Sequence, residues 1–186
     1  MRLIAIVGMT GSGKSEASVI FEKMGYQRIR FGDITDDILK EKGLELTEEN
    51  ERSVRENLRK DHGMSAYAKM NVPKVREAVS KKNVIIDGLY SWEEYVLLKQ
   101  EFPFMVVLAV YAPPALRYER LVEREVRPLT YEQSRGRDKN EIENLNKAAP
   151  ISMADYTIVN TGTLFDLKAS TQKFLDWFDQ KDEEPK

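Results

Sequence analysis

The 186-residue sequence contains no cysteine. Disulfide bonds, thiolate metal sites and a cysteine nucleophile are therefore excluded together. Histidine is nearly as scarce, since His62 is the only one. Its charged neighbourhood indicates a surface residue, and no spacing in the chain is typical of a structural zinc site or an acyl-transfer triad. Each absence narrows the chemistry that the chain can perform.

Long apolar runs and a strong net charge are missing as well. The N-terminal run from Leu3 to Val7 is too short for a signal peptide or a membrane span. The formal charge of -2 and the isoelectric point near 5.7 give no broad positive field for a nucleic-acid backbone. We therefore expect a cytoplasmic protein that binds neither membranes nor nucleic acid, and the sequence leaves its oligomeric state open.

The chain has the alternating pattern of an α/β protein. Short apolar runs bounded by turn residues predict five strands, at Leu3 to Val7, Arg28 to Phe31, Val84 to Asp87, Phe104 to Tyr111 and Tyr156 to Asn160. Helix-like segments lie between them, which indicates a three-layer fold with a parallel sheet and helices on both faces. We expect one domain over residues 1–180, a strand-free helical insertion at about 36–82, and a frayed tail at 181–186.

Helix boundaries follow from glycine, proline and capping signals. The first helix is predicted from near Gly13 to about Gly25. Pro73 is predicted to start the last helix of the insertion, because its ring disfavours a helix interior. Capping-box patterns predict further helix starts just after Ser91 and Thr130.

One motif carries a specific chemistry. The pattern G-x-x-x-x-G-K-[ST] is formed by Gly8, Met9, Thr10, Gly11, Ser12, Gly13, Lys14 and Ser15. A buried-type strand precedes it and a helix-forming stretch follows it, as a phosphate-binding P-loop requires. Backbone N–H groups and the helix dipole would face the phosphates, Lys14 the β- and γ-phosphates, and the Ser15 hydroxyl a Mg²⁺ ion. ATP and Mg²⁺ are the predicted cofactors; the alternative is a glycine-rich turn with a solvated lysine.

Two aspartates follow predicted strands at the edge where ligands bind in open parallel sheets. Asp87 is a candidate for holding Mg²⁺ or accepting a proton, and the alternative is an acidic turn residue before Gly88. Asp33 is a candidate for orienting or deprotonating the acceptor hydroxyl, but it would also suit the N-cap of the next helix. Both residues are predicted catalytic groups.

A predicted lid at about 124–140 is rich in arginine. A continuous helix would align four arginines along one side, Arg117, Arg120, Arg124 and Arg127, with Arg135 and Arg137 following. We predict that Arg120 and Arg124 clamp the transferring phosphoryl group. The alternative is a surface helix with salt bridges to Glu119, Glu123 and Glu125.

With these residues in view, the sequence resembles the P-loop nucleotide kinases. The C-terminal run Ala154-Asp155-Tyr156-Thr157-Ile158-Val159-Asn160-Thr161-Gly162 resembles the alanine-aspartate, strand, asparagine-glycine signature of dephospho-CoA kinase. A mainly archaeal, adenylate-kinase-related family is more similar. That resemblance is carried by Gly11-Ser12-Gly13-Lys14-Ser15-Glu16, Gly32-Asp33, Leu58-Arg59 before Gly63, Ile86-Asp87-Gly88, Arg117 through Arg124, and the same C-terminal run.

The resemblance implies a helical acceptor-binding insertion and a lid that closes over ATP. It places Asn160 and Gly162 near the adenine and Arg59 near the acceptor. The chain departs from the archaeal pattern at Asp36 and Tyr90, where arginine is usual. An acceptor phosphate would lose expected partners there.

The sequence therefore predicts an ATP-dependent small-molecule kinase with a nucleotide-like acceptor, either dephospho-CoA or a nucleoside monophosphate. The alternative is a nucleotide-dependent binding module or switch with slow ATP hydrolysis. No Asn-Lys-x-Asp base-reading motif of guanine switches occurs, and Gly88 rather than an acid follows Asp87. Both observations favour the kinase.

Overall fold

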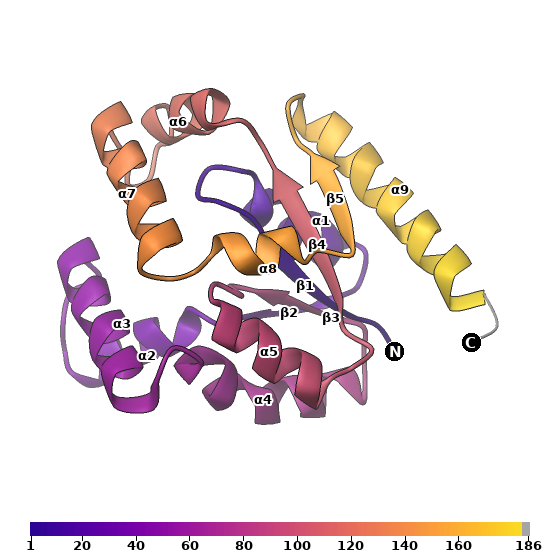
Figure 1. Ribbon diagram of the computed structural model, residues 1–186, viewed down its shortest axis with the longest axis horizontal. Helices are drawn as coiled ribbons and strands as arrows, with labels where there is room; N and C mark the ends of the chain where they lie inside the picture. The colour runs from indigo at the N-terminus through magenta and orange to yellow at the C-terminus, as the bar shows by residue number, and fades with distance from the viewer. Residues whose placement is uncertain (184–186) are drawn as a thin grey trace.

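The computed structural model describes residues 1–183, and Figure 1 shows its strands surrounded by helices. The strands are β1 (Leu3–Val7), β2 (Gln27–Arg30), β3 (Val84–Asp87), β4 (Val106–Tyr111) and β5 (Tyr156–Val159). The helices are α1 (Lys14–Lys23), α2 (Asp33–Glu41), α3 (Glu48–His62), α4 (Ala66–Val79), α5 (Trp92–Glu101), α6 (Pro114–Val122), α7 (Tyr131–Glu143), α8 (Ala148–Ser152) and α9 (Leu164–Glu183). Of the tail predicted at 181–186, residues 181–183 continue α9 and the others lie outside the described residues. Within the described part of the chain, no helix combines the length and apolar character needed to cross a membrane.

The predicted fold class is confirmed. All strand pairs are parallel, and the strand order is β2-β3-β1-β4-β5. The register places Ile6 opposite both Asp87 and Leu108, so the carboxyl ends of the three central strands meet at one edge. A ligand site is expected at that edge in an open parallel sheet.

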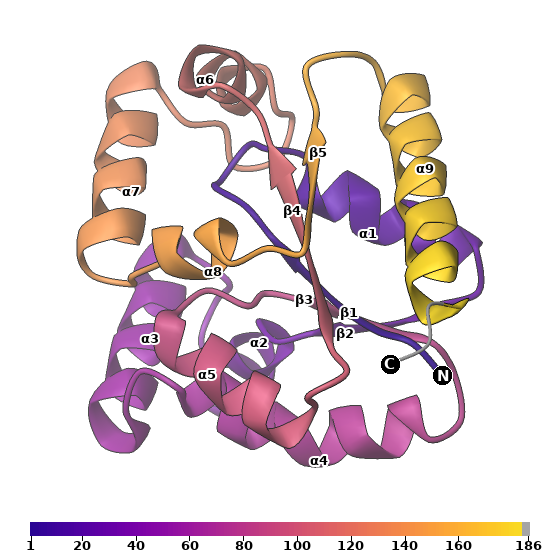
Figure 2. The ribbon, with the colours of Figure 1, turned by 45° about the vertical axis from the view of Figure 1, so that its right-hand side comes forward.

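Side chains of successive strand residues alternate between two cores. Leu3, Ala5 and Val7 pack into the cluster that contains α4 and α5 residues. Ile4 and Ile6 pack on the opposite face, against α1 and α9. Figure 2 shows these two helix pairs on opposite sides of the sheet. Every residue of β1 and β3 is buried, as expected for central strands covered on both faces.

The predicted helix start at Pro73 is wrong, because Pro73 lies inside α4. The helix starts at Ala66, since Tyr67 and Ala68 on its first turn and Val75 on its third are all buried in the core. Burial of this apolar face outweighs the hydrogen bond that the proline nitrogen cannot donate. The segment from α2 to α4 contains no strand in the structure.

The continuous arginine-bearing helix was also a wrong expectation. Helix α6 ends at Val122, so Arg124 and Arg127 lie in the connection to α7. Arg127 has a positive φ of 56°, and Pro128 follows it, which disfavours a helical conformation there. After α7, the short helix α8 leads the chain back to β5 (Figure 1).

Candidate active site

The loop from Gly8 to Ser15 connects β1 to α1 at the carboxyl edge of the sheet. Gly13 is the N-cap of α1 with φ 100°, and Gly11 has φ 81°. A β-carbon at Gly11 would approach Arg117 O to 2.8 Å, and one at Gly13 would collide with the Asn160 amide. Both glycines therefore permit close contact with α6 and with the end of β5. Ser12 Oγ is buried in the loop and has no hydrogen-bond partner among the described residues.

Lys14 lies on the first turn of α1, and its Nζ donates to Met9 O at 2.8 Å. Part of the side chain is exposed, but protein groups enclose the ammonium. Burial, and after it the nearby Lys147, lowers the pKa of Lys14 to about 7 against the opposing effects of Glu141 and Asp87. A phosphate chain beside Lys14 would restore the ordinary preference for the charged form.

Glu141 on α7 reaches into the P-loop. Its Oε1 accepts from the Thr10 hydroxyl at 2.5 Å, and its Oε2 lies 3.3 Å from the Thr10 backbone nitrogen, which donates to it. Burial alone would raise the pKa of Glu141, but Lys147, Thr10 and Lys14 together lower it to about 2. The Glu141 carboxylate thus accepts from P-loop donors of the kind that bind phosphate.

Lys147, between α7 and α8, completes this cluster. Its Nζ lies 2.8 Å from Glu141 Oε2 and 4.8 Å from the centre of the Tyr90 ring. The residue is 2% exposed, and burial lowers the pKa of its ammonium while Glu141 opposes that effect. An ammonium this deeply buried requires anionic partners.

Asp87 ends β3 and lies near enough to Lys14 to interact with it electrostatically. Its Oδ2 accepts from Arg28 Nη2 at 2.5 Å and from Arg28 Nε at 3.1 Å. Within residues 1–183 no group of three acidic or histidine side chains could hold a metal alone. Magnesium commonly binds through one or two protein oxygens plus phosphates. The exposed Ser15 on α1 and the Asp87 carboxylate fit such a site.

Asp33 is the first residue of α2, and Gly32 rather than Asp33 occupies the N-cap position. The capping alternative for Asp33 is therefore wrong. Its Oδ1 accepts from Arg30 Nη1 at 3.1 Å, and Asp36 accepts from the same nitrogen at 2.8 Å. Arg30 also interacts electrostatically with Tyr90. A guanidinium from β2 thus lies beside Asp36 and near Tyr90, the two positions at which the family resemblance implies arginine.

Arg59 on α3 faces polar groups of the helical insertion. Its guanidinium lies 5.3 Å from the centre of the Tyr67 ring, and its Nε is buried without a hydrogen-bond partner among the described residues. Glu94 is fully buried nearby; burial raises its pKa to about 7, although the Tyr90 N–H and Arg59 oppose the shift.

Arg120 contacts the loop after β5. Its Nη2 lies 3.5 Å from Gly162 O. Asn160 in the same loop donates to Ser12 O at 2.8 Å. The loop that contains Asn160 and Gly162 therefore contacts both Arg120 and the P-loop.

The connection at 123–130 contacts the helical insertion. Arg127 Nη2 lies 2.7 Å from Glu51 Oε1 on α3. Arg124 donates to Arg127 O and so helps to shape the connection. The predicted lid and the predicted insertion touch each other at this ion pair.

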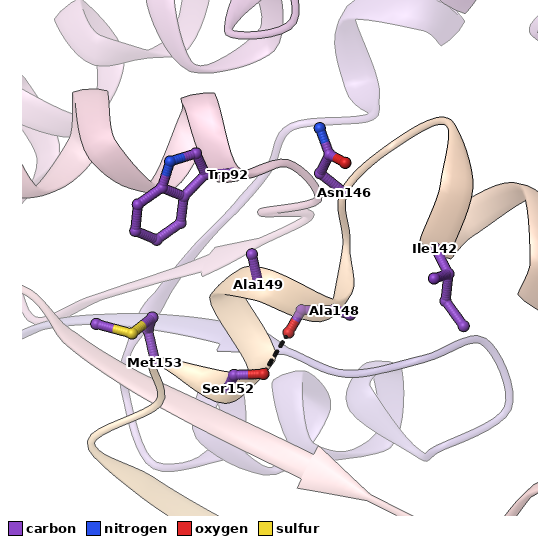
Figure 3. Close-up of a pocket in the computed structure, with 7 residues that line it drawn as sticks. All are labelled: Trp92, Ile142, Asn146, Ala148, Ala149, Ser152 and Met153. Atoms are coloured by element: carbon purple, nitrogen blue, oxygen red, sulfur yellow. Dashed lines mark hydrogen bonds between the residues drawn. The ribbon is translucent and has the colours of Figure 1, made fainter.

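An apolar cavity of about 520 Å³ lies between α5, α7 and α8 (Figure 3). Its lining residues are Trp92, Ile142, Asn146, Ala148, Ala149, Ser152 and Met153. Asn146 and Ala148 flank Lys147, so the cavity adjoins the segment that supplies this lysine.

Sequence reasoning missed Glu141, Lys147, Arg28 and Arg30. No motif marks them. Glu141 meets Thr10 across 131 residues of sequence and Arg28 meets Asp87 across 59, whereas Arg30 meets Asp33 and Asp36 across the turn from β2 into α2. A spacing rule detects neighbours on one helix or strand, and these residues are not such neighbours.

Comparison with known proteins identifies a family and relatives. A family model described as an AAA domain matches residues 4–146. The UPF0200 protein of Thermococcus kodakarensis is 37% identical over 179 residues, which cover 94% of this chain and 96% of the relative. The UPF0200 protein of Thermococcus onnurineus is 40% identical over 163 residues, covering 85% and 88%.

Solved structures are similar in fold. A shikimate kinase from Bacteroides thetaiotaomicron aligns with a TM-score of 0.62 and 12% identity, covering 96% of this chain and 98% of that one. A gluconokinase from Sinorhizobium meliloti aligns with a TM-score of 0.61 and 15% identity, covering 97% and 94%. The likeness shows a P-loop kinase-like fold.

Proposed function

This chain belongs to the UPF0200 family and carries the AAA domain, and from that premise we propose that it is an ATP-dependent small-molecule kinase. The γ-phosphate would pass to a nucleotide-like acceptor, either dephospho-CoA or a nucleoside monophosphate. The observation that carries the proposal is the P-loop with Lys14 enclosed beside Asp87 and facing a lid segment that touches the helical insertion. Phosphoryl transfer requires a donor site and an acceptor site that are enclosed by the same lid.

The donor half rests on the loop itself. Its backbone N–H groups and the N-terminus of α1 suit the phosphates, and Lys14 suits the charge that develops on the transferred group. Magnesium bound by Ser15 and Asp87 would neutralise the remaining triphosphate charge. Arg28 holds one carboxylate oxygen of Asp87 and thereby fixes its orientation.

The acceptor half lies between the end of β2 and the helical insertion. Asp33 is a candidate for orienting the acceptor hydroxyl, and Arg30 beside it supplies a guanidinium for an acceptor anion. Arg59 Nε, in the helical insertion, is buried without a hydrogen-bond partner within residues 1–183. These groups favour an acceptor that carries both a hydroxyl and a negative charge.

Names of structural neighbours point the same way. The two aligned proteins are a shikimate kinase and a gluconokinase, which are named for small-molecule acceptors. Shared fold supports this reaction class for the present chain, while the acceptor must be argued from its own residues.

The test is acceptor-dependent ADP formation. Purified protein is incubated with Mg²⁺, ATP and one acceptor at a time, with dephospho-CoA and AMP first, and phosphorylated product is identified by mass spectrometry. Acceptor-dependent turnover well above the ATP-only rate supports the proposal. ATP binding with slow hydrolysis that no acceptor stimulates, together with ATP-dependent binding of a macromolecule, would overturn it in favour of a switch.

A further inference from the structure

We propose that Lys147 is a further phosphate-binding residue of the active site and that the Glu141 carboxylate competes with phosphate for Lys147 and for Thr10. The inference rests on the proposed nucleotide site. It assigns to the α7–α8 segment a direct part in recognising the phosphate chain.

The contacts of Glu141 are those of a phosphate group. Its two oxygens accept from the hydroxyl and the backbone N–H of Thr10, within the glycine loop, and from the Lys147 ammonium. Phosphate oxygens accept from the same classes of donor in P-loops. A phosphate placed at Thr10 would meet the carboxylate at close range, so the two anions exclude each other.

The local charges leave a surplus of positive charge. Lys147 and Arg137 both interact electrostatically with Lys14, and the acids near the three cations are Glu141, Asp87 and Asp138. Asp138 is paired with Arg117. Asp87 is already paired with Arg28. Glu141 therefore serves three cations, Lys14, Lys147 and Arg137, and the last two lower the pKa of Lys14. An oligophosphate supplies several negative charges at this place, where one carboxylate supplies one.

The Lys147 backbone is held while its side chain is able to change partners. The Lys147 N–H donates to Glu141 O at 3.0 Å, which fixes the lysine at the end of α7. Its ammonium lies over the Tyr90 ring, between α7 and the P-loop side of the sheet. Release of Glu141 would leave the ammonium buried next to Lys14, where only another anion can compensate it.

The Glu141–Lys147 pair therefore sets a minimum negative charge that a ligand must carry in order to bind. An anion must offer enough charge to replace the Glu141 carboxylate at both Lys147 and Thr10. A triphosphate meets this condition better than a phosphate-free nucleoside, which makes the pair a determinant of donor specificity.

The experiment measures binding of inorganic tripolyphosphate, ATP and adenosine by isothermal titration calorimetry. Glu141→Gln keeps the shape and the acceptor oxygen but removes the competing charge. We expect it to bind tripolyphosphate and ATP about tenfold more tightly than the parent, the scale of one close charge interaction near a protein surface. Lys147→Met is expected to weaken both by about tenfold or more. Adenosine binding should be unchanged in both.

A matched control lies on the same helix. Lys139 and Glu143 form an exposed pair with 3.9 Å between Nζ and Oε2. Glu143→Gln and Lys139→Met repeat the two substitutions away from the P-loop and should leave tripolyphosphate binding unchanged. Lys147→Arg keeps the positive charge, and it should bind tripolyphosphate more tightly than Lys147→Met.

Two outcomes overturn the inference. Unchanged or weaker tripolyphosphate binding by Glu141→Gln would show that the carboxylate does not compete. Unchanged tripolyphosphate binding by folded Lys147→Met would remove Lys147 from the site. If the methionine variant does not fold, the result with Glu141→Gln decides the inference alone. If either result is obtained while ADP formation still depends on the acceptor, the further inference fails and the proposed kinase function stands. If Glu141→Gln binds tripolyphosphate more tightly but no acceptor is turned over, the proposed kinase function fails and the further inference stands.

Discussion

Arg117 and Asp138 form a two-pronged salt bridge that joins α6 to α7. Arg117 Nη1 lies 2.7 Å from Asp138 Oδ1, and Nη2 lies 2.6 Å from Oδ2. Nη1 also donates to Thr10 O at 2.9 Å, and Nε donates to Ala112 O at 3.1 Å. One buried guanidinium thus connects the P-loop, the end of β4 and the helix that carries Glu141.

Removing this guanidinium is expected to destabilise the fold. Arg117→Ala leaves the Asp138 carboxylate without its main partner in a buried setting, which costs about 3–5 kcal/mol of unfolding free energy. The measurement is urea denaturation. Arg117→Ala in an Asp138→Asn background should cost less, because the uncompensated charge is gone. Equal costs in the two backgrounds would contradict a coupled pair.

Glu94 is expected to make stability fall as pH rises. Burial raises the pKa of Glu94 to about 7, from an ordinary value of 4.5. Between these values the folded protein holds a proton that the unfolded chain releases, so the contribution of Glu94 to stability is fully present below pH 4.5 and is lost as pH rises to about 7. The loss amounts to about 2–4 kcal/mol.

Glu94→Gln tests this assignment, because glutamine retains an oxygen for the Tyr90 and Ser91 N–H groups. Denaturation from pH 4.5 to 8 should show the variant gaining on the parent as pH rises. Glu56→Gln, on an exposed part of α3, serves as the control. Parallel pH profiles for the parent and Glu94→Gln would refute the prediction.

Lys14→Ala is expected to reduce turnover by about 100-fold or more while leaving the fold intact. The reason is that in the proposed reaction the Lys14 ammonium would face the transferring charge, whereas its hydrogen bond to Met9 O lies within the same loop. Steady-state ADP formation is the measurement, with circular dichroism as the check on folding. Lys23→Ala, at the exposed end of α1, should keep parental activity. Equal rates for Lys14→Ala and the parent would sink the phosphate role.

Arg127→Ala should loosen the contact between the 123–130 connection and α3. The pair with Glu51 is partly exposed, so we expect a loss of about 0.5–1 kcal/mol, which is a two- to fivefold rise in the KM for the acceptor. The kcat should change less than KM, since the residue contacts no reacting group. Arg52→Ala on the exposed face of α3 is the control. An unchanged acceptor KM would mean that the contact plays no part in closure.

Local sequence patterns were sufficient to predict central strands of the sheet and the starts of two helices. The strands Leu3–Val7 and Val84–Asp87 have the predicted bounds, and both capping boxes, at Ser91 and Thr130, are present. Strands and caps are specified within a few residues of sequence, by apolar runs and by side chains that bond to neighbouring N–H groups. The prediction for Pro73 was wrong because packing of α4 against the core outweighed the preference of proline for the start of a helix.

The sequence by itself determined the parallel α/β fold and the phosphate loop from Gly8 to Ser15, since these depend on short-range spacing. Only the tertiary structure decided what surrounds that loop. It brought Glu141 and Lys147 onto Thr10, Arg28 onto Asp87, and Arg30 onto Asp33 and Asp36. The contacts of Glu141 and Lys147 arise because the chain returns from α7 through α8 to the sheet edge. Arg28 meets Asp87 because β2 and β3 are neighbouring strands, and Arg30 meets Asp33 and Asp36 where the chain turns from β2 into α2.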